Sequence, residues 1–582
     1  MNPNPQIIVL DAGGQYCHLI ARKVRDLGVY AEIRASETAA SELAAAKGVI
    51  ISGGPASVYD PGSPTVDAAL FDLGLPVLGI CYGQQLMAHA LGGEVRRGEK
   101  GEYGLAALEL DDSPDPLFAG LSGGQQIWMS HFDVVAAAPP GFYVTGRTPT
   151  CAIAAIANPE RAMYGVQFHP EVVHTTRGKE YLSNFVFRVC GCGQDWDPRH
   201  RVPILEREIR DAVGGRNVFF FVSGGVDSSV AFALCTRALG PDRVRGVYVD
   251  TGLMRQGETD WVSRIPGLTV ERAEDQFLGA LAGVTDPEQK RHIIGEEFVR
   301  VQERIIESRR LLDEQWILGQ GTIYPDTIES GGTVKASLIK THHNRVAGIQ
   351  KLIAAQRIVE PLKSFYKDEV REVGAELGLP AELLERHPFP GPGLAIRCLC
   401  SPDDAPLCQT PDGWLIPIKS VGVQGDERSY APVIVIDSAA GSLDYGRAID
   451  IVNRVRDVNR VIAPVETRVP VASMQVWKSE LSAERLARLR RADAAVRALS
   501  HQSGYDRKVW QFPVILIPLG TAEAPDSIVL RPIDSVDGMT ARSVPMEPAL
   551  RDAICASVLE DPTIASVFYD LTHKPPGTIE WE

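Results

Sequence analysis

The amino-acid sequence predicts an α/β protein: two parallel-sheet α/β domains, followed by an α+β C-terminal domain that contains two similar β-α-β modules. In the first two-thirds of the chain, short apolar runs that end in glycine alternate with amphipathic stretches, the pattern of buried parallel strands joined by helices. Beyond residue 397 such strands become rare and charged helices more frequent. A length of 582 residues exceeds what one core supports. We therefore expect domains at residues 6–195, 200–397 and 398–582.

The composition is that of an ordinary folded protein, with 45% hydrophobic and 23% charged residues. A net charge of −15 argues against a nucleic-acid partner and against binding to an anionic membrane. Apolar runs are all shorter than the roughly 20 residues that span a bilayer, and the start of the chain lacks the basic region of a signal peptide. The 10 cysteines are too irregularly spaced for a disulfide framework, so we expect a reducing, cytoplasmic location.

In the first domain, three segments fit buried parallel strands that open into tight turns. They are QIIVLDAGG at 6–14, GVIISGGP at 48–55 and LPVLGICYG at 75–83. Ligands of α/β sheets bind at the carboxyl ends of the strands. We therefore look for functional residues in the turns that follow these runs.

A candidate nucleophile, Cys81, lies where the third of these strands meets a predicted helix. Small residues on both sides, Gly79 and Gly83, permit a strained turn that lifts the sulfur out of the sheet. A helix N-terminus lowers the pKa of a thiol placed there. A single buried cysteine is nevertheless more often inert packing than a nucleophile, so Cys81 needs a partner base.

The segment YGVQFHPE at 164–171 offers that base and its partner. Alternate residues of an extended segment share a face, so His169 and Glu171 point the same way. A cysteine nucleophile needs a base, and the base needs an acceptor for its second ring nitrogen. Cys81, His169 and Glu171 can fill these three catalytic roles.

Two other histidines are alternative bases on sequence grounds. His131 lies in an apolar stretch, where a structural histidine is the competing interpretation. His174 lacks an acidic residue two positions further on. The sequence alone leaves these alternatives open.

The G-x-C-x-G turn and the later H-P-E together resemble the class I (triad) glutamine amidotransferases over residues 6–190. The resemblance implies that Cys81 attacks the side-chain amide of glutamine, forms a thioester and releases ammonia, with His169 carrying the proton. It also implies oxyanion donors and glutamine contacts, which are the backbone N–H groups of Gly54 and Tyr82, the side chain of Gln85, and the segment 129–133 with Ser130 and His131.

A linker at 192–203, with Pro198 and Pro203, leads to the second domain. There the segments RNVFFFVSGG (216–225), DRVRGVYVDTGL (242–253) and DEQWILGQGT (313–322) again read as glycine-tipped parallel strands.

The first of these strands ends in a loop suited to phosphate. Consecutive N–H groups, two glycines and three hydroxyls precede a helix. The lysine of the Walker pattern is absent, and a carboxylate stands in the loop instead, which fits a site that also binds Mg²⁺. A turn that merely joins strand to helix is the alternative. The loop comprises Ser223, Gly224, Gly225, Val226, Asp227, Ser228 and Ser229.

The S-G-G-x-D-S pattern of this loop resembles the N-type ATP pyrophosphatases. The resemblance implies cleavage of ATP between the α- and β-phosphates, with the loop holding pyrophosphate and Asp227 holding Mg²⁺. Four further segments, at 319–326, 339–344, 387–394 and 574–582, are similar to the GMP synthetase family, so the resemblance extends over nearly the whole chain.

This second resemblance implies three small-molecule substrates: glutamine, ATP and xanthosine 5′-monophosphate (XMP). It implies amination of XMP to GMP through an adenylyl intermediate, a ligase reaction of purine biosynthesis. Lys340 is expected to help hold pyrophosphate. The positions that match the family's XMP contacts are Arg291, Asp426, Gln511, Lys574 and Glu580. A glutamine-dependent NAD synthetase and a non-catalytic regulator that senses glutamine or nucleotide are the rival hypotheses.

The C-terminal domain contains a weak internal repeat. The strings LIPI at 415–418 and LIPL at 516–519 open two units of nearly equal length, which predicts modules at about 413–470 and 511–582. Chance similarity of short apolar strings is the alternative. Shorter members of the resembled family pair through a single module, so we expect this chain to be a monomer, with a homodimer as the alternative.

Overall fold

The computed structural model describes residues 4–582 except 15, 112–114, 123, 173, 325, 327–345, 425–426, 437–441, 456 and 536–540. Lys340 and Asp426 therefore lie outside the described residues. The chain divides into two compact units, residues 1–201 and 202–582, and the division falls inside the predicted linker. The predicted boundary at residue 397 lies within the second unit, where one continuous apolar core runs from Phe219 to Leu571.

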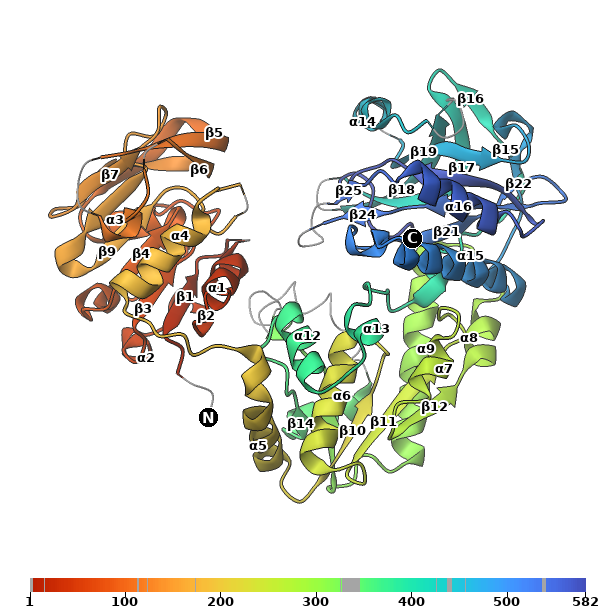
Figure 1. The fold of residues 1–582 in the computed structure, drawn as a ribbon, viewed down its shortest axis with the longest axis horizontal. Coiled ribbons are helices and arrows are strands. Elements are labelled where there is room, and N and C mark those ends of the chain that lie inside the picture. Colours follow the sequence, from red (N-terminus) through yellow and green to blue (C-terminus); the bar gives the residue numbers. More distant parts are fainter. Residues whose placement is uncertain are drawn as a thin grey trace. The chain divides into compact units, whose positions relative to one another are not determined.

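The first unit is built on a mixed sheet with the strand order β2-β1-β3-β4-β9-β8-β7-β5-β6 (Figure 1). Strands β2 to β9 in this order are parallel, as predicted, and the remaining pairs are antiparallel, which the glycine-tipped pattern did not reveal. The strands are β1 (Ile7–Asp11), β2 (Ala31–Ala35), β3 (Gly48–Ile51), β4 (Val77–Ile80), β5 (Glu94–Leu110), β6 (Gln125–Ala137), β7 (Tyr143–Arg147), β8 (Ala155–Asn158) and β9 (Met163–Val166).

Successive side chains of the parallel strands point to opposite faces of the sheet and pack in two apolar layers, one on each face. Val9 and Ile50 pack on one side of the sheet, and Leu10 and Ile51 pack on the other. Helices cover both layers, because each crossover between parallel strands returns over one face. The helices are α1 (Cys17–Arg25), α2 (Ala40–Leu43), α3 (Tyr82–Ala90), α4 (Gly178–Ser183) and a π-helical segment Asn184–Val189.

The second unit begins with a fully parallel sheet in the order β12-β11-β10-β13-β14. The chain starts in the centre at β10, builds β11 and β12 outward, and then crosses to β13 on the other side. This reversal makes the carboxyl ends of β10 and β13 a topological switch point, where such folds bind ligands. The strands are β10 (Asn217–Phe221), β11 (Val244–Asp250), β12 (Leu268–Arg272), β13 (Trp316–Gly319) and β14 (Ile358–Val359).

Helices join these strands, and α9 and α12 carry charged residues of the candidate sites. They are α5 (Val202–Val213), α6 (Val226–Leu239), α7 (Glu258–Val262), α8 (Glu274–Leu281), α9 (Pro287–Ser308), α11 (Ala347–Ala354), α12 (Lys367–Glu376) and α13 (Ala381–Leu384).

The C-terminal part of the second unit has a sheet of order β16-β17-β18-β19-β26-β23-β21. Strands β17 and β18 form an antiparallel pair, and β18 continues through α14 to the parallel strand β19. Strands β21, β23 and β26 repeat this arrangement with α16 as the crossover helix, and β19 and β26 meet antiparallel between the two sets. The sheet therefore contains two β-α-β modules of the same topology. Their origin by duplication stays a prediction.

The strands of this part are β15 (Ala405–Pro406), β16 (Cys408–Thr410), β17 (Gly413–Gln424), β18 (Glu427–Ile436), β19 (Arg460–Thr467), β20 (Gln475–Val476), β21 (Val514–Ile517), β22 (Leu519–Gly520), β23 (Asp526–Leu530), β24 (Ile533–Asp534), β25 (Arg542–Ser543) and β26 (Ile564–Asp570). The helices are α14 (Tyr445–Arg454), α15 (Ala483–Gln502) and α16 (Pro548–Val558).

A buried ion cluster fixes the end of the chain against this sheet. Asp570, at the end of β26, accepts hydrogen bonds from Arg460 at 3.0 Å and from the indole of Trp581 at 2.9 Å, and it pairs with Arg531 at 2.6 Å. Burial alone raises the pKa of this carboxyl, but the two guanidinium groups outweigh it and hold the pKa below its usual value. The last residues are therefore anchored, which positions the C-terminal glutamates described below.

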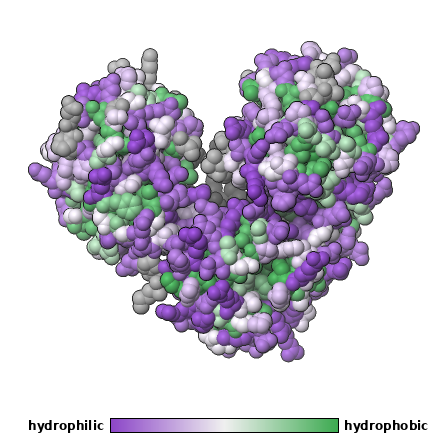
Figure 2. All heavy atoms as spheres, in the orientation of Figure 1, coloured by the Kyte–Doolittle hydropathy of each residue, from purple (hydrophilic) through white to green (hydrophobic). Residues whose placement is uncertain are grey.

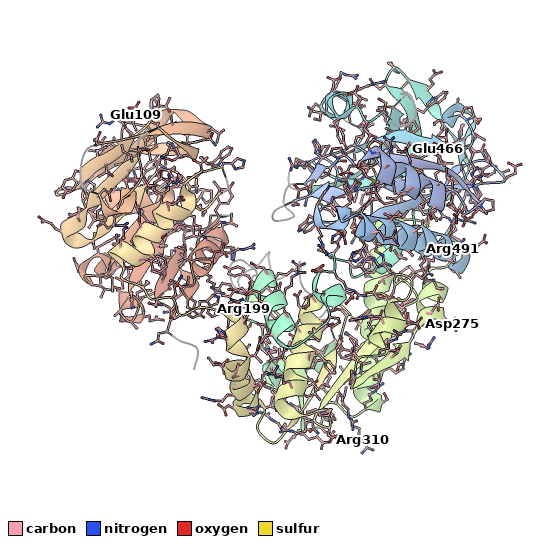
Figure 3. The ribbon with its side chains drawn as sticks, viewed as in Figure 1. Glu109, Arg199, Asp275, Arg310, Glu466 and Arg491 are labelled. Carbon is pink, nitrogen blue, oxygen red and sulfur yellow. The ribbon has the colours of Figure 1, made fainter. Side chains whose placement is uncertain are left out.

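The outer surface is mainly polar. Figure 2 shows hydrophilic residues over most of the visible face of each unit, with apolar residues in smaller patches. On α15, Arg491 points outward, 59% exposed, and pairs with Asp561 beyond α16 (Figure 3). Within the described ranges, every helix is too short or too polar to cross a lipid bilayer.

Candidate active sites

The turn at Cys81 is as strained as its sequence predicts. Strand β4 ends at Ile80, α3 begins at Tyr82, and Cys81 between them has a φ of +52°, which a non-glycine residue rarely adopts. A Cβ at Gly83 would lie 2.2 Å from the carbonyl oxygen of Ile51, and one at Gly79 would lie 2.5 Å from that of Gly83. The backbones approach so closely that only glycine fits at both positions. This close approach holds the thiol of Cys81 at the N-terminus of α3.

The base and its acceptor lie beside this turn. His169 follows β9, the neighbour of β4, and its Nδ1 is 2.7 Å from Oε1 of Glu171. Burial lowers the pKa of His169, but the carboxylate of Glu171 and hydrogen bonds with Cys81 and Glu171 together raise it well above its ordinary value. The structure thus brings Cys81, His169 and Glu171 together, in the arrangement that the predicted roles of nucleophile, base and orienting carboxylate require.

The two alternative bases have other partners. His131 lies next to Glu102, with its Nε2 3.2 Å from Oε2 of that residue. The ring of His174 packs at a tilt of 33° against that of Trp128, with 4.6 Å between the centroids. His169 is the histidine for which the structure gives a hydrogen bond with Cys81.

The predicted oxyanion donors border the nucleophile. A Cβ at Gly53 would lie 3.5 Å from Cβ of Cys81 and 3.0 Å from Cε1 of His169, so the turn after β3 runs directly alongside the pair. Gly54 follows, and a Cβ there would lie 2.3 Å from the carbonyl oxygen of Ala12. The N–H of Tyr82 belongs to the first turn of α3, whose N–H groups have no partner within the helix.

Of the predicted glutamine contacts, Ser130 touches Cys81, whereas the amide of Gln85 is bonded to other residues. The carbonyl oxygen of Ser130 accepts from the thiol of Cys81 at 3.7 Å, which places the 129–133 segment against the nucleophile. Gln85 donates to the carbonyl oxygen of Asp133 at 2.8 Å and to Gln167 at 3.1 Å. Because its amide N–H groups are thus engaged and the side chain is buried, Gln85 supports the wall of the site in this structure.

Several further residues of this site were not predicted from the sequence. Asp133 accepts from the hydroxyls of Ser57 and Tyr59, the latter at 2.9 Å, and so holds the loop after β3. The hydroxyl of Thr175 donates to the carbonyl oxygen of His169 at 2.6 Å. Glu102 contacts His131 from β5. Nothing in the local sequence pattern distinguishes these polar residues from solvated ones.

The predicted phosphate loop lies at the switch point of the second unit. Residues 222–225 connect β10 to α6, residues 226–229 begin α6, and Gly224 has a φ of +78°. The hydroxyls of Ser223 and Ser228 are 3.0 Å apart, and the N–H of Gly225 donates to Ser223 at 3.3 Å. A Cβ at Gly321, beyond β13, would lie 2.8 Å from Cα of Ser228, so the next strand's loop closes against this one.

Asp227 and its surroundings fit a divalent cation. Its Oδ1 is buried without a hydrogen-bond partner, and burial raises the pKa of the carboxyl. A second carboxylate, Asp326, acts on it electrostatically. Oxygen ligands of this kind are those that Mg²⁺ prefers, and the unpartnered Oδ1 offers one ligand position.

Basic residues that were not predicted from the sequence surround the same loop. Lys367, the first residue of α12, lies 3.6 Å from Oδ2 of Asp227. Arg371, one turn further, acts electrostatically on the same carboxylate. Arg386 donates to the carbonyl oxygen of Gly224 at 3.2 Å. These cations can balance a polyphosphate bound in the loop.

A second polar cluster gathers around Glu580, near the end of the chain. Arg397, which is fully buried, binds Glu580 through two hydrogen bonds of 2.8 and 2.6 Å. Gln511 donates to Glu580 at 3.2 Å and to the carbonyl oxygen of Pro388 at 3.0 Å. Arg291, on α9, donates to the backbone oxygen of Glu582. Burial raises the pKa of Glu580, but Arg397, Arg255 and Arg291 outweigh it and lower that pKa.

Three of the predicted XMP contacts, Arg291, Gln511 and Glu580, are thus brought together from three distant parts of the sequence. Lys574 lies on the same C-terminal tail, where its backbone pairs with Ala541. Arg397, three residues beyond the segment 387–394, was not predicted from the sequence.

Comparison with known proteins agrees with this geometry. The family description "Glutamine amidotransferase class-I" matches residues 8–189, "NAD synthase" matches residues 199–262, and "GMP synthase C terminal domain" matches residues 499–581. A curated protein of Leptospira interrogans, "Probable GMP synthase [glutamine-hydrolyzing]", is 43% identical over 600 residues and covers 99% of both chains. This chain belongs to the glutamine-hydrolysing GMP synthase family.

Two further proteins are similar to parts of this chain. A "GMP synthase [glutamine-hydrolyzing]" of Symbiobacterium thermophilum is 46% identical over 507 residues, which cover 80% of this chain and 98% of the relative. Among solved structures, a putative GMP synthase subunit from Thermoplasma acidophilum matches 32% of this chain and 95% of its own, at 28% identity and a TM-score of 0.29. The predicted α/β fold class and the family resemblance are confirmed, and the chain is a ligase with a glutamine amidotransferase domain.

The raised pKa of His169 depends on Glu171, which gives a testable prediction. In Glu171→Gln, burial dominates and the pKa of His169 falls, so the imidazolium that protonates the leaving amine is lost at a lower pH. Glutamate formation from glutamine is expected to fall by about 10²–10⁴-fold, and the alkaline limb of its pH profile to move to lower pH.

The matched control is Glu180→Gln, which removes an exposed carboxylate, paired with Arg177, from α4. That variant should keep the wild-type rate and profile. An unchanged pH profile in Glu171→Gln would show that Glu171 does not hold the proton on His169.

Proposed function

We propose that this chain converts XMP, ATP and the amide nitrogen of glutamine into GMP, AMP, pyrophosphate and glutamate. The observation that supports this most is the presence, in one chain, of a cysteine-histidine-glutamate triad and a Ser-Gly-Gly loop with an acidic residue. The first is suited to releasing ammonia, and the second to expelling pyrophosphate.

In the first unit, His169 holds the proton of the Cys81 thiol, and the resulting thiolate attacks the side-chain carbonyl carbon of glutamine. The N–H groups of Gly54 and Tyr82 stabilise the oxyanion, a contribution of about 3 kcal/mol for such donors. His169 then protonates the leaving amine, so ammonia departs and a thioester remains. Water, deprotonated by His169, hydrolyses the thioester to glutamate.

In the second unit, the C2 oxygen of XMP attacks the α-phosphorus of ATP, and pyrophosphate leaves. The N–H groups of the 223–229 loop, with Lys367 and Arg386, hold the departing pyrophosphate. Asp227, with Asp326 beside it, would hold Mg²⁺, which neutralises phosphate charge when bound. Ammonia then attacks C2, and AMP leaves as GMP forms.

The cluster around Glu580 is the proposed XMP site. Arg291 and Lys574 carry the positive charge that a 5′-phosphate needs, while Gln511 and Glu580 offer hydrogen bonds to the base or sugar. Arg397 orients the carboxylate of Glu580 through its two hydrogen bonds. Asp426 and Lys340 remain proposed contacts from the sequence alone.

The rival hypotheses have less support. The NAD synthase description matches residues 199–262, the region of the shared phosphate loop, whereas the relatives matched over nearly the full length are named GMP synthases. A non-catalytic sensor would not need the strained geometry of Cys81 or its contact with His169.

The choice of nitrogen source, glutamine or ammonium, distinguishes glutamine hydrolysis in the first unit from amination of XMP in the second. In Cys81→Ala, GMP formation from glutamine is expected to fall by on the order of 10³-fold or more, because the nucleophile is gone. GMP formation from added ammonium, with XMP and Mg-ATP, should remain near the wild-type rate. Both rates are followed by chromatography of the nucleotides.

Cys408→Ser, which changes an exposed cysteine on β16, is the matched control and should keep both rates. A wild-type chain that makes no GMP from either nitrogen source would refute the proposed function. A Cys81→Ala variant that still uses glutamine would refute the role of the triad.

We further propose that the chain is a monomer. The two β-α-β modules already meet antiparallel through β19 and β26, so a contact that a single module would seek from a second chain is satisfied within one chain. The shorter Symbiobacterium relative, which aligns with 80% of this chain, supports the view that part of the chain is additional. Light scattering at micromolar concentration should give the mass of one chain, 63.2 kDa, and a dimer mass would contradict the proposal.

A further inference from the structure

Three potential metal ligands from separate elements converge in the first unit. Glu102 on β5, His131 on β6 and Cys151 in the turn before β8 each offer a ligand atom, and these atoms lie within 4.8 Å of one another. The side chain of His131 is 3% exposed and that of Glu102 is 17% exposed, while Cys151 is buried. None of the three belongs to the Cys81-His169-Glu171 triad.

The hydrogen bonds of His131 leave a nitrogen lone pair facing this cluster. Its Nδ1 is 3.1 Å from the carbonyl oxygen of Asp133, which can only accept, so the proton of the neutral ring resides on Nδ1. Nε2 then carries a lone pair and lies 3.2 Å from Oε2 of Glu102. Both atoms are buried and make no hydrogen bond in the described structure. Two buried acceptors that face each other favour a cation between them.

Protonation of His131 is one way to supply that positive charge, but burial opposes it. A metal ion satisfies the same two atoms with a neutral imidazole, which is the form that binds metals.

The third ligand, Cys151, is held in place by its own turn. Its N–H donates to the hydroxyl of Thr148 at 2.9 Å, and the hydroxyl of Thr150 donates to Oε1 of Glu102. These contacts orient the thiol and the carboxylate, as outer hydrogen bonds do around metal ligands. A thiol that coordinates a metal ion loses its proton to solvent, because the ion stabilises the thiolate.

We propose that Glu102, His131 and Cys151 form a binding site for one zinc-class divalent cation. Zinc binds imidazole, thiolate and carboxylate at about 2.0–2.3 Å, and in a tetrahedral site such bonds hold the ligand atoms about 3.3–3.8 Å apart. Nε2 of His131 and Oε2 of Glu102 already lie at nearly that spacing, at 3.2 Å. The ligand atoms all lie within 4.8 Å of one another, so a shift of at most about 1 Å brings Cys151 into the site. Three protein ligands leave a fourth position for water. The mixed sulfur and nitrogen set selects zinc over magnesium or calcium.

Occupation of this site would alter the glutaminase. His131 follows Ser130, whose carbonyl oxygen contacts the thiol of Cys81, and both lie in the predicted glutamine-binding segment. A bound ion fixes His131 away from glutamine, so zinc is expected to inhibit glutamine-driven but not ammonium-driven synthesis. The metal site itself does not depend on the proposed function, because its occupancy is measured without turnover.

Zinc could also inhibit by binding the thiol of Cys81, and the test separates the two sites. Cobalt(II) replaces zinc as a spectroscopic probe, because a cobalt-thiolate bond gives a charge-transfer band in the near ultraviolet. The full-length Cys81→Ala variant is titrated with Co²⁺, and bound metal is counted after gel filtration. We expect one Co²⁺ per chain with the charge-transfer band, and release of the ion by excess zinc.

The double variant Cys81→Ala/Cys151→Ser should lose the band, and Cys81→Ala/Glu102→Gln should weaken binding at least tenfold. Glu102→Gln keeps the side-chain volume, so it remains informative if the serine variant does not fold, as judged by circular dichroism. Cys81→Ala/Cys408→Ser is the matched thiol control and should keep the band. A band that is absent in Cys81→Ala, or that survives loss of Cys151, would overturn the proposal.

Discussion

Close approach of two backbone segments at the carboxyl ends of parallel strands is the constraint on which both candidate sites depend. At Gly83 and at Gly321 a single added Cβ would lie 2.2 and 2.8 Å from a neighbouring backbone atom. These contacts press a strand-to-helix turn against the loop of the adjacent strand. In the first unit the turn presents a thiol, and in the second it presents N–H groups and a carboxylate.

The same topology explains why residues distant in sequence act together. Cys81, His169 and the Gly53–Gly54 turn follow β4, β9 and β3, which are neighbours in one parallel sheet. The phosphate loop follows β10, and the segment that closes on it follows β13, the strand paired with β10 across the switch point. The two sites differ in their charged residues. In the first unit, the carboxylate of Glu171 raises the pKa of His169 and so keeps it protonated. In the second unit, Lys367 and Arg386 bring positive charge to the phosphate loop.

Much of this arrangement was predictable from the sequence because glycine-tipped apolar runs mark strand ends. The triad, the phosphate loop and the α/β class follow from local pattern together with family resemblance. The antiparallel half of the first sheet was missed, since β5 and β6 carry no glycine tips and alternate polar with apolar residues. Arg397, Lys367 and Glu102 were not predicted either. Each of them contacts a partner that is distant in the sequence, namely Glu580, Asp227 and His131, and a local sequence pattern cannot indicate such contacts.

The most direct test of this account is the ratio of glutamine-driven to ammonium-driven GMP formation in Gly83→Ala. The added Cβ meets the backbone of Ile51, so the Cys81 turn must shift while the second unit is untouched. We predict that the glutamine-driven rate falls by on the order of 10²-fold or more and that the ammonium-driven rate persists. Gly193→Ala, where an added Cβ meets nothing within 4 Å, should leave the ratio unchanged. A Gly83→Ala variant with the wild-type ratio would contradict the account.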